Sequence, residues 1–181
     1  MVARRLISAG ATAARGVADV AIPADPGLYA WWSRPGVLPD LLHGSDGPTI
    51  HPEGNLELLY VGIANRSLRR RVNGNHLGRQ TGSSTLRRAL ASWIGETEGW
   101  EREWRAGRQQ LTVRSEVGLT AWMIEHLWLT WAEHSSPRDA ETDVIRLLRP
   151  PLNRANNSSH PNYVELRRRR QVWRSGGTTI V

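Results

Sequence analysis

Two apolar runs of strand length stand near the start of the 181-residue chain, at 27–32 and 56–63. Each run contains a tyrosine, Tyr29 in the first and Tyr60 in the second. The segment between them, 33–55, is rich in Pro, Gly, Asp and His, a composition typical of a surface loop. The pattern therefore predicts two strands joined by a long inserted loop, which would act in substrate recognition or as a lid. Because side chains alternate along a strand, the adjacent Trp31 and Trp32 cannot share a face, and one of them is expected to point outward.

A helix is expected at 68–76, with Ser67 as its N-cap. At about 100° per residue, Arg71 falls on the side of the apolar positions, whereas Arg69 and Arg70 point elsewhere. Arg71 is therefore the arginine of this triplet that is aimed beside the core.

Helical periodicity also marks later segments. Ser84 precedes a strongly amphipathic helix in which Arg87 and Arg88 lie outside the apolar face. The charged stretch 95–110 is interpreted as an exposed helix or loop. The pattern further predicts a short helix at 119–126, a third strand at 127–132, a helix from Pro137 to Leu148 that ends before Pro150, and a basic helix from Tyr163 to Arg174.

Composition narrows the class of partner. All 24 basic residues are arginine, the formal net charge is +7 and the sequence pI is about 11.2. Guanidinium groups bind phosphate through paired hydrogen bonds, so nucleic acid is the leading partner and an acidic membrane surface a distant second. The absence of cysteine excludes disulfides, zinc–thiolate sites and thiol nucleophiles. No apolar run approaches the ~20 residues of a membrane helix, and the cytoplasm is the default location.

We expect three parts in the chain. An N-terminal extension covers 1–24, a single domain covers 25–155 with the inserted loop at 33–55, and a basic C-terminal helix and tail cover 156–181. The extension is rich in Ala and is interpreted as helical or partly disordered, and the Gly-containing tail as disordered.

Glu141 is the acidic residue that stands out. On the predicted helix it shares a side with Ile145 and Leu148, at the edge of an apolar stripe that also includes Leu147. A carboxylate at such a position needs an arginine, a hydrogen bond or a cation. A structural Glu–Arg pair and a metal ligand are both open interpretations at this point.

Four ordered motifs connect these features. They are Gly27-Leu28-Tyr29, Tyr60-Val61-Gly62, Leu68-Arg69-Arg70-Arg71 and the segment from Glu141 through Ile145 and Pro150 to Asn153. Together they resemble the GIY-YIG endonuclease superfamily over residues 27–153. The resemblance implies an α/β (α+β) fold in which a small three-stranded antiparallel sheet is flanked by helices. It also implies hydrolysis of phosphodiester bonds that depends on a divalent metal, Mg²⁺ or Mn²⁺.

The resemblance assigns roles to individual residues. It places Tyr29 and Tyr60 side by side, with one of them orienting or deprotonating the attacking water. It implies that Arg71 binds the scissile phosphate and that Glu141 is the sole protein ligand of the metal. A neighbouring cation and Arg71 are expected to lower the pKa of the tyrosine from its ordinary value of ~10.

Two further residues complete the implied site. Asn153 is implied to secure the tyrosine-lined pocket by hydrogen bonding. His76 matches, with a spacing that differs by one residue, a histidine that would assist proton transfer; alone, it would be interpreted as a capping or surface histidine.

The expected function is a metal-dependent DNA endonuclease of restriction, defence or repair. The alternatives are a catalytically silent nucleic-acid-binding module and an RNA-directed nuclease or toxin on the same scaffold. A homodimer would supply two sites for cutting both strands. Phosphate contacts are assigned to basic residues outside the catalytic set, with a solvated basic surface as the alternative: Arg69, Arg70, Arg87, Arg88, Arg167, Arg168, Arg169 and Arg170.

Overall fold

An antiparallel sheet forms the centre of the protein, which is described by a computed structural model for residues 2–43, 47–78 and 81–176. Its three long strands are β2 (Gly27–Ser33), β4 (Leu56–Ala64) and β7 (Leu127–Glu133), with β2 in the middle. Two-residue strands, β1 (Thr12–Ala13) and β3 (Ile50–His51), lie at the edges, so the order is β1-β7-β2-β4-β3. The predicted three-stranded antiparallel sheet is confirmed, with a short strand added at each edge.

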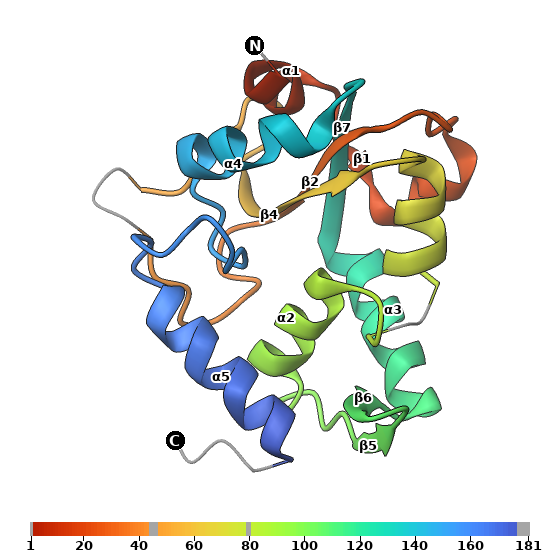
Figure 1. Ribbon diagram of the computed structural model, residues 1–181, viewed down its shortest axis with the longest axis vertical. Helices are drawn as coiled ribbons and strands as arrows, with labels where there is room; N and C mark the ends of the chain where they lie inside the picture. The colour runs from red at the N-terminus through yellow and green to blue at the C-terminus, as the bar shows by residue number, and fades with distance from the viewer. Residues whose placement is uncertain (1, 44–46, 79–80, 177–181) are drawn as a thin grey trace.

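Helices cover both faces of this sheet, which confirms the mixed α+β class (Figure 1). One face carries α1 (Val2–Ser8) and α4 (Pro137–Leu148), which lie above the sheet in the view. The other face carries the 3₁₀ segment η1 (Ala14–Asp19), the π-helix η2 (Arg70–His76), α2 (Thr85–Ile94) and α3 (Val113–His126). The last helix, α5 (Tyr163–Ser175), packs against α2.

The two adjacent tryptophans of β2 are buried under different helical layers. Trp31 lies in the core shared with η2, α2 and α3, and Trp32 lies in the core shared with α1 and α4. Both side chains are 0% exposed. The alternation along the strand holds, but the expectation that one tryptophan faces outward is wrong, because no face of the long strands is left to solvent.

The predicted helices are present, and two of them begin directly after a serine. Ser84 caps α2 by accepting a hydrogen bond from the backbone N–H of Arg87. Ser136 precedes α4, although its side chain makes no capping hydrogen bond. The helix predicted at 119–126 begins earlier, at Val113, and is followed directly by β7 as expected.

The charged stretch at 95–110 differs from the prediction. It contains a separate two-stranded hairpin, formed by β5 (Arg102–Arg105) and β6 (Arg108–Leu111). Ala106 and Gly107 connect the strands with φ values of 50° and 70°, the positive values that a tight two-residue hairpin turn requires. The turn itself carries only one glycine, Gly107, so the local sequence lacks the usual signal of a two-residue hairpin turn.

The ends of the chain and the inserted loop contribute to the packing. Leu6 and Val17 from the N-terminal 24 residues are buried in the two cores. In the inserted loop, Leu38 is buried and the Pro39 carbonyl accepts a hydrogen bond from the Trp93 indole N–H. The tail residues 177–181, for which disorder was expected, lie outside the described residues. Among the described helices, none has the length and apolar character needed to cross a bilayer.

Candidate active site

The two tyrosines lie on one face of the sheet, on neighbouring strands. In the antiparallel register, Tyr29 of β2 is opposite Gly62 of β4, and Tyr60 is opposite Trp31. The side chains of all four positions therefore share the face that η2 covers. The centroids of the two tyrosine rings are 6.5 Å apart and their planes are tilted by 33°. The expected side-by-side arrangement is present.

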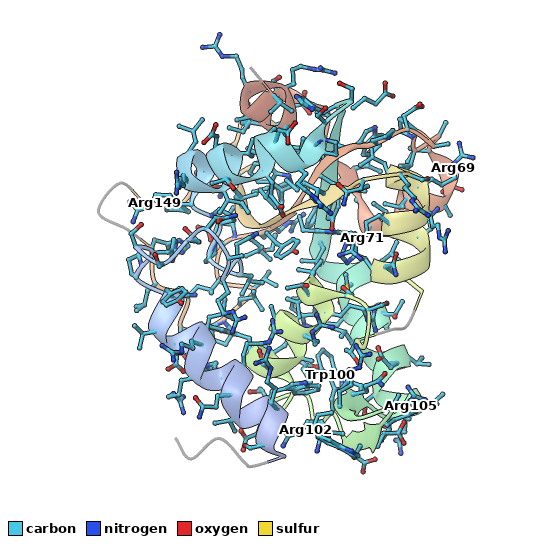
Figure 2. The ribbon with its side chains drawn as sticks, in the orientation of Figure 1. Arg69, Arg71, Trp100, Arg102, Arg105 and Arg149 are labelled. Carbon is cyan, nitrogen blue, oxygen red and sulfur yellow. The ribbon has the colours of Figure 1, made fainter. Side chains whose placement is uncertain are left out.

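The helix that delivers Arg71 is a π-helix. Its backbone follows the i→i+5 pattern, as in the 2.9 Å bond from Leu77 N to the Val72 carbonyl. In an α-helix, residues five apart differ by about 140° around the axis, at about 100° per residue. The wider π turn instead brings Arg71 and His76 to the same side, and both reach Tyr29. In Figure 2, Arg71 points toward the middle of the molecule while Arg69 lies at its outer edge.

The start of this segment matches the prediction. The Ser67 side chain accepts a hydrogen bond from Arg70 N at 3.2 Å, which is the contact expected of an N-cap. Arg69 is directed away from the tyrosines, and its Nε donates to the Ile22 carbonyl. Arg71 is thus the inward-facing member of the triplet, as the periodicity indicated.

The Tyr29 hydroxyl is the meeting point of the site. Arg71 Nε donates to it over 3.2 Å, and His76 Nε2 lies 2.7 Å from it. On the other side of the imidazole, His76 Nδ1 lies 2.8 Å from Ser84 Oγ. A continuous chain of hydrogen-bonding groups therefore runs from Arg71 through Tyr29 and His76 to the N-cap of α2. Ser84 was recognised in the sequence only as a cap, and its second contact could not be inferred from a linear pattern.

Burial dominates the electrostatics of these groups. It raises the pKa of Tyr29, an effect that Tyr60 increases and Arg71 opposes, and it also raises the pKa of Tyr60. Arg71 acts in the expected direction and lowers the pKa of Tyr29, but burial outweighs it in the protein alone, so the combined effect of Arg71 and a bound cation stays a prediction. Burial, together with the positive charges of Arg71 and Arg87, holds the pKa of His76 well below 6.5. His76 is consequently neutral at physiological pH.

Glu141 lies on α4 and is half-buried. No hydrogen bond or ion pair of its carboxylate is found within the described segments. Burial raises its pKa, while Arg138 and Arg71 act in the opposite direction. Among the described residues, Glu141 therefore does not form the structural Glu–Arg pair considered from the sequence. One detail of the helix prediction is wrong, because Leu147 is 70% exposed and does not belong to the apolar stripe.

The residues present fit a divalent cation such as Mg²⁺. In residues 2–43, 47–78 and 81–176 there is no cluster of three or more His, Asp or Glu side chains that could hold a metal. Mg²⁺, however, keeps several waters and needs only one or two carboxylates together with substrate phosphate. A half-buried carboxylate that is unpaired among the described residues, and whose charge acts on Tyr29 and Tyr60, meets that requirement. Glu141 is the residue that would hold the ion.

Asn153 supports the strand that carries Tyr60. Its Oδ1 accepts from Val61 N at 2.9 Å, and its Nδ2 donates to the Val61 carbonyl at 2.8 Å. These two bonds imitate a strand partner at the edge of β4 that faces away from β2, where β3 is too short to reach. The neighbouring Leu152 N bonds to the Leu59 carbonyl in the same way. Asn153 thus contacts the backbone next to Tyr60 rather than either hydroxyl.

Arg87 is not a surface residue, and this corrects the sequence interpretation. It is 0% exposed, and its Nη2 lies 2.6 Å from Glu116 Oε2. Its Nη1 donates to the His76 carbonyl at 2.7 Å, so the buried pair also holds the end of η2. The other Glu116 oxygen accepts from the backbone N–H and hydroxyl of Thr81. Arg87 therefore has no surface through which to contact phosphate.

The basic run on α5 divides by environment. Arg168 and Arg169 both bond to Glu165, and Arg169 also lies over the Trp93 ring, 4.4 Å from its centroid. Arg167 is exposed, whereas Arg170 is only 6% exposed, so the expected run of four solvated charges is wrong at its last member. Helical geometry turns every fourth position toward the core, even in a run of identical residues.

Comparison with protein families identifies the domain. Residues 27–172 match the model of the GIY-YIG catalytic domain. The chain belongs to the GIY-YIG family. The match covers the tyrosine strands, η2, α4 and most of α5, and the domain carries a nuclease-type function, the hydrolysis of phosphodiester bonds. No curated protein and no solved structure matches the chain significantly.

Proposed function

We propose that this GIY-YIG protein is an endonuclease that cleaves DNA with the help of a divalent metal ion. The observation that carries the proposal is the convergence of Arg71 and His76 on the Tyr29 hydroxyl, which the charge of the Glu141 carboxylate also reaches. A silent binding module would gain nothing from a buried, neutral histidine held against a buried tyrosine. A hydrolytic enzyme needs such an arrangement, because the attacking water must lose a proton.

Tyr29 is the tyrosine that we assign to the attacking water. It has a proton acceptor within hydrogen-bonding distance, His76 Nε2, and no comparable partner of Tyr60 is found in the described segments. With its own proton on Nδ1, directed at Ser84 Oγ, His76 can accept the hydroxyl proton of Tyr29 as Tyr29 takes one from the water. The raised pKa of Tyr29 keeps the resting hydroxyl protonated and therefore ready for this exchange.

Arg71 and Tyr60 are assigned to the scissile phosphate. Arg71 uses its Nε on Tyr29 and one Nη on the Ser83 carbonyl. The guanidinium has five N–H donors, so others remain for a phosphate oxygen. In this assignment its positive charge would stabilise the negative charge that develops on the phosphate in the transition state. Tyr60, 7% exposed, would donate its hydroxyl to the same phosphate.

Glu141 is assigned to the metal ion. When bound, Mg²⁺ or Mn²⁺ would supply Lewis acidity at the phosphate and a bound water of lowered pKa. Glu141 itself contributes a carboxylate that is desolvated, unpaired and oriented by α4. Arg138 and Arg71 act on its charge without forming an ion pair with it.

DNA is the proposed substrate because the net charge is +7 and all of the basic residues are arginine. The same site would act on RNA in the alternative of an RNA-directed nuclease. One site per chain means that both strands of a duplex are cut by two copies or by two successive nicks. A role in restriction, defence or repair and a cytoplasmic location stay predictions.

The test is incubation of the purified protein with supercoiled plasmid, modified genomic DNA and RNA, each with Mg²⁺, with Mn²⁺ and with EDTA. We expect metal-dependent cleavage of DNA, with RNA cut more slowly or left intact. Binding without cleavage of any substrate would identify a silent module. Preferential cleavage of RNA would identify the alternative nuclease.

A further inference from the structure

Arg170 on α5 is a buried guanidinium. The residue is 6% exposed, and its Nε is enclosed with no hydrogen-bond acceptor among the described residues. Across residues 2–43, 47–78 and 81–176, no hydrogen bond, ion pair or aromatic contact of the side chain is found. A buried charge without a counterion is costly unless something else pairs with it. Within the described part of the chain, Arg170 therefore lacks a partner for its charge.

Other guanidinium groups gather near Arg170 without acidic partners. Arg88 Nη1 and Arg108 Nη1 each donate to the Gly82 carbonyl at 2.8 Å, so two positive charges meet at one neutral oxygen. Burial, Arg88, Arg174 and Arg154 lower the pKa of Arg170 to about 10. In the described segments none of these arginines forms an ion pair with a carboxylate.

A pocket opens beside this cluster, between α2, the β5–β6 hairpin and α5. Its volume is about 470 Å³. Its walls carry three cations and two indole rings: Arg88, Arg108, Arg174, Trp104 and Trp173. Trp104 is 66% exposed, which leaves its ring available for stacking.

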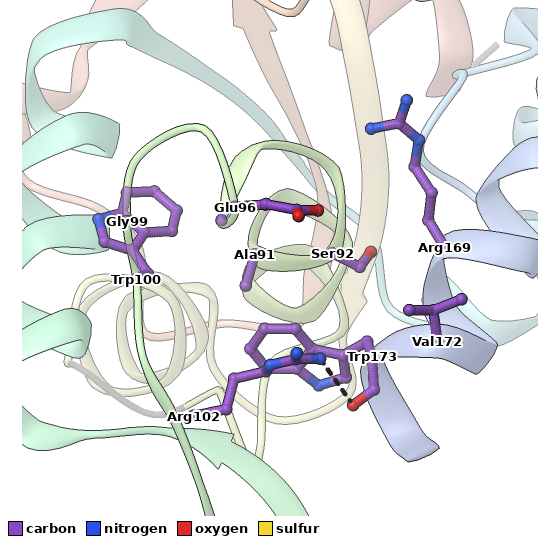
Figure 3. Close-up of a pocket in the computed structure, with 10 residues that line it drawn as sticks. Ala91, Ser92, Glu96, Gly99, Trp100, Arg102, Arg169, Val172 and Trp173 are labelled. Carbon is purple, nitrogen blue, oxygen red and sulfur yellow. Dashed lines mark hydrogen bonds between the residues drawn. The ribbon is translucent and has the colours of Figure 1, made fainter. Parts of the chain in front are cut away.

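The neighbouring pocket shown in Figure 3 is different in kind. It measures about 270 Å³ and lies between the end of α2 and α5. There, Arg102 lies over the Trp173 ring and donates to the Trp173 carbonyl, and Arg169 is held by Glu165. The cations of that pocket are matched by protein groups, whereas Arg170 is not.

We propose that Arg170, with Arg88, forms a second phosphate-binding subsite for the substrate strand, next to the site of the scissile phosphate. This inference rests on the proposed nuclease function. Arg170 lies one helical turn before Arg174 on α5, and Arg174 lines the pocket together with Arg88. Residues of α2 and α5 pack in the same core as Tyr60, whose hydroxyl also feels the charges of Arg170 and Arg88, so the subsite lies on the tyrosine side of the sheet. From there the nucleic-acid strand would continue into the pocket. Arg108 and Arg174 would contact the next phosphate, and Trp104 would stack on a base.

Phosphate is the chemistry that fits. A guanidinium binds phosphate through paired hydrogen bonds, and two converging guanidinium groups match a phosphodiester in charge and shape. A peptide carboxylate could pair with one arginine. It would leave the two tryptophans of the pocket and the other arginines between the pocket and Tyr60 without a role. The same chemistry is offered by free inorganic phosphate, so the experiment separates the two sources.

The first measurement is thermal unfolding of wild type, Arg170→Met and Arg4→Met in phosphate-free buffer of low salt, with and without inorganic phosphate. Arg4→Met removes the same charge from an exposed position on α1, on the face of the sheet opposite the tyrosines. We expect Arg170→Met to melt at a higher temperature than wild type without phosphate, because a buried charge is removed. Phosphate should stabilise wild type and Arg4→Met but not Arg170→Met. An Arg170→Met protein that melts lower than wild type, or does not fold, would show that Arg170 stabilises the fold and would overturn the proposal.

The second measurement is binding of a fluorescent DNA oligonucleotide in EDTA, where no cleavage occurs, as a function of salt. We expect Arg170→Met to weaken binding by roughly tenfold or more. The slope of log K against log [salt] should become shallower by about one. Arg4→Met should stay close to wild type. Equal losses for the two variants would show that only overall charge matters and would overturn the subsite.

These outcomes separate the subsite from the nuclease proposal. In one outcome the wild type cleaves no nucleic acid, and phosphate stabilises the wild type but not Arg170→Met. The anion site then exists without the proposed activity, and its ligand is free phosphate. A protein that cleaves DNA but shows no difference between the two variants keeps the nuclease function and loses the subsite.

Discussion

The ring of Tyr29 lies across the backbone of Gly62 on the neighbouring strand. The two residues are paired in the β2–β4 register, and a Cβ at position 62 would overlap the Tyr29 hydroxyl oxygen and ring. Gly62 does not have a positive φ, so its role is to leave space rather than to adopt an unusual conformation. At the other motif, a Cβ on Gly27 would lie 2.5 Å from the Ala132 carbonyl oxygen. Both motif glycines are thus explained by close packing around the tyrosine strands.

Gly62→Ala should therefore reduce both stability and activity. The methyl group must displace the Tyr29 ring, at a cost of about 1–3 kcal/mol for overpacking. Because that shift moves the hydroxyl away from Arg71 and His76, DNA cleavage should fall by about 100-fold. Gly16→Ala is the matched control, since a Cβ there meets no atom within 4 Å. The measurements are urea unfolding and cleavage rate, and a fully active Gly62→Ala enzyme would contradict the assignment of Tyr29.

Stability should decrease as the pH falls below 6.5, in part because of His76. The unfolded chain binds a proton near pH 6.5, whereas the folded protein, in which burial and two arginines depress the pKa of His76, does not. The free energy of unfolding should then drop by about 1.4 kcal/mol per pH unit for each such histidine. His160, whose pKa burial lowers to about 4, acts in the same direction down to that pH.

The measurement for this prediction is urea unfolding of wild type and His76→Gln at several pH values between about 7.5 and 4.5, the range in which the unfolded histidines titrate. The variant should show a shallower dependence on pH by about one proton. Identical slopes for the two proteins would mean that His76 is protonated in the folded state, which would remove it as a proton acceptor for Tyr29.

The buried Arg87–Glu116 pair should be sensitive to the loss of one member. Arg87→Met leaves the Glu116 carboxylate buried without its counterion, at a cost of about 3–5 kcal/mol. Adding Glu116→Gln removes that charge and keeps an oxygen for Thr81 N, so the double variant should recover part of the loss. If the double variant loses as much unfolding free energy as the two single variants together, the two residues do not interact directly, which would contradict the pair. Urea unfolding of the single and double variants provides the comparison.

Asn153 should act as a positioning residue. Asn153→Asp keeps an acceptor for Val61 N but loses the donor to the Val61 carbonyl and places a charge beside it. We expect a loss of about 1–3 kcal/mol in stability. Displacement of Tyr60 should also make cleavage less efficient. The main effect should be a higher KM, because Tyr60 is assigned to phosphate binding. A variant with wild-type stability and no activity would instead place Asn153 in contact with the substrate.

Elements with clear periodicity were predictable from the sequence. The strands at 27–32 and 56–63, the helix 137–148 and the inward direction of Arg71 follow from local patterns that tertiary structure leaves unchanged. The geometry of η2 was not predictable, since an α-helical projection separates Arg71 from His76 and only the π turn brings them together. The meeting of His76 with Tyr29 therefore required the structure.

Charged residues were the least predictable part of the site. Arg87 and Arg88 are adjacent in sequence, yet one is buried against Glu116 and the other lies at a basic pocket. Their environments are set by α3, the hairpin and α5, which come later in the chain. Arg170 shows the same limit, because a run of four arginines gives no sign of which member faces the core.

The proposed metal site is tested most directly by comparing Glu141→Ala with Asp143→Ala. Both variants remove one carboxylate from α4, but Asp143 is exposed, whereas Glu141 is half-buried and its charge acts on Tyr29 and Tyr60. The measurement is the cleavage rate in Mg²⁺ on whichever nucleic acid the wild type cleaves among plasmid, modified genomic DNA and RNA, with thermal unfolding as the check on folding. We expect Asp143→Ala to cleave like wild type, and Glu141→Ala to fold and bind DNA without cleaving it. Wild-type cleavage by Glu141→Ala would contradict the proposed metal-dependent site.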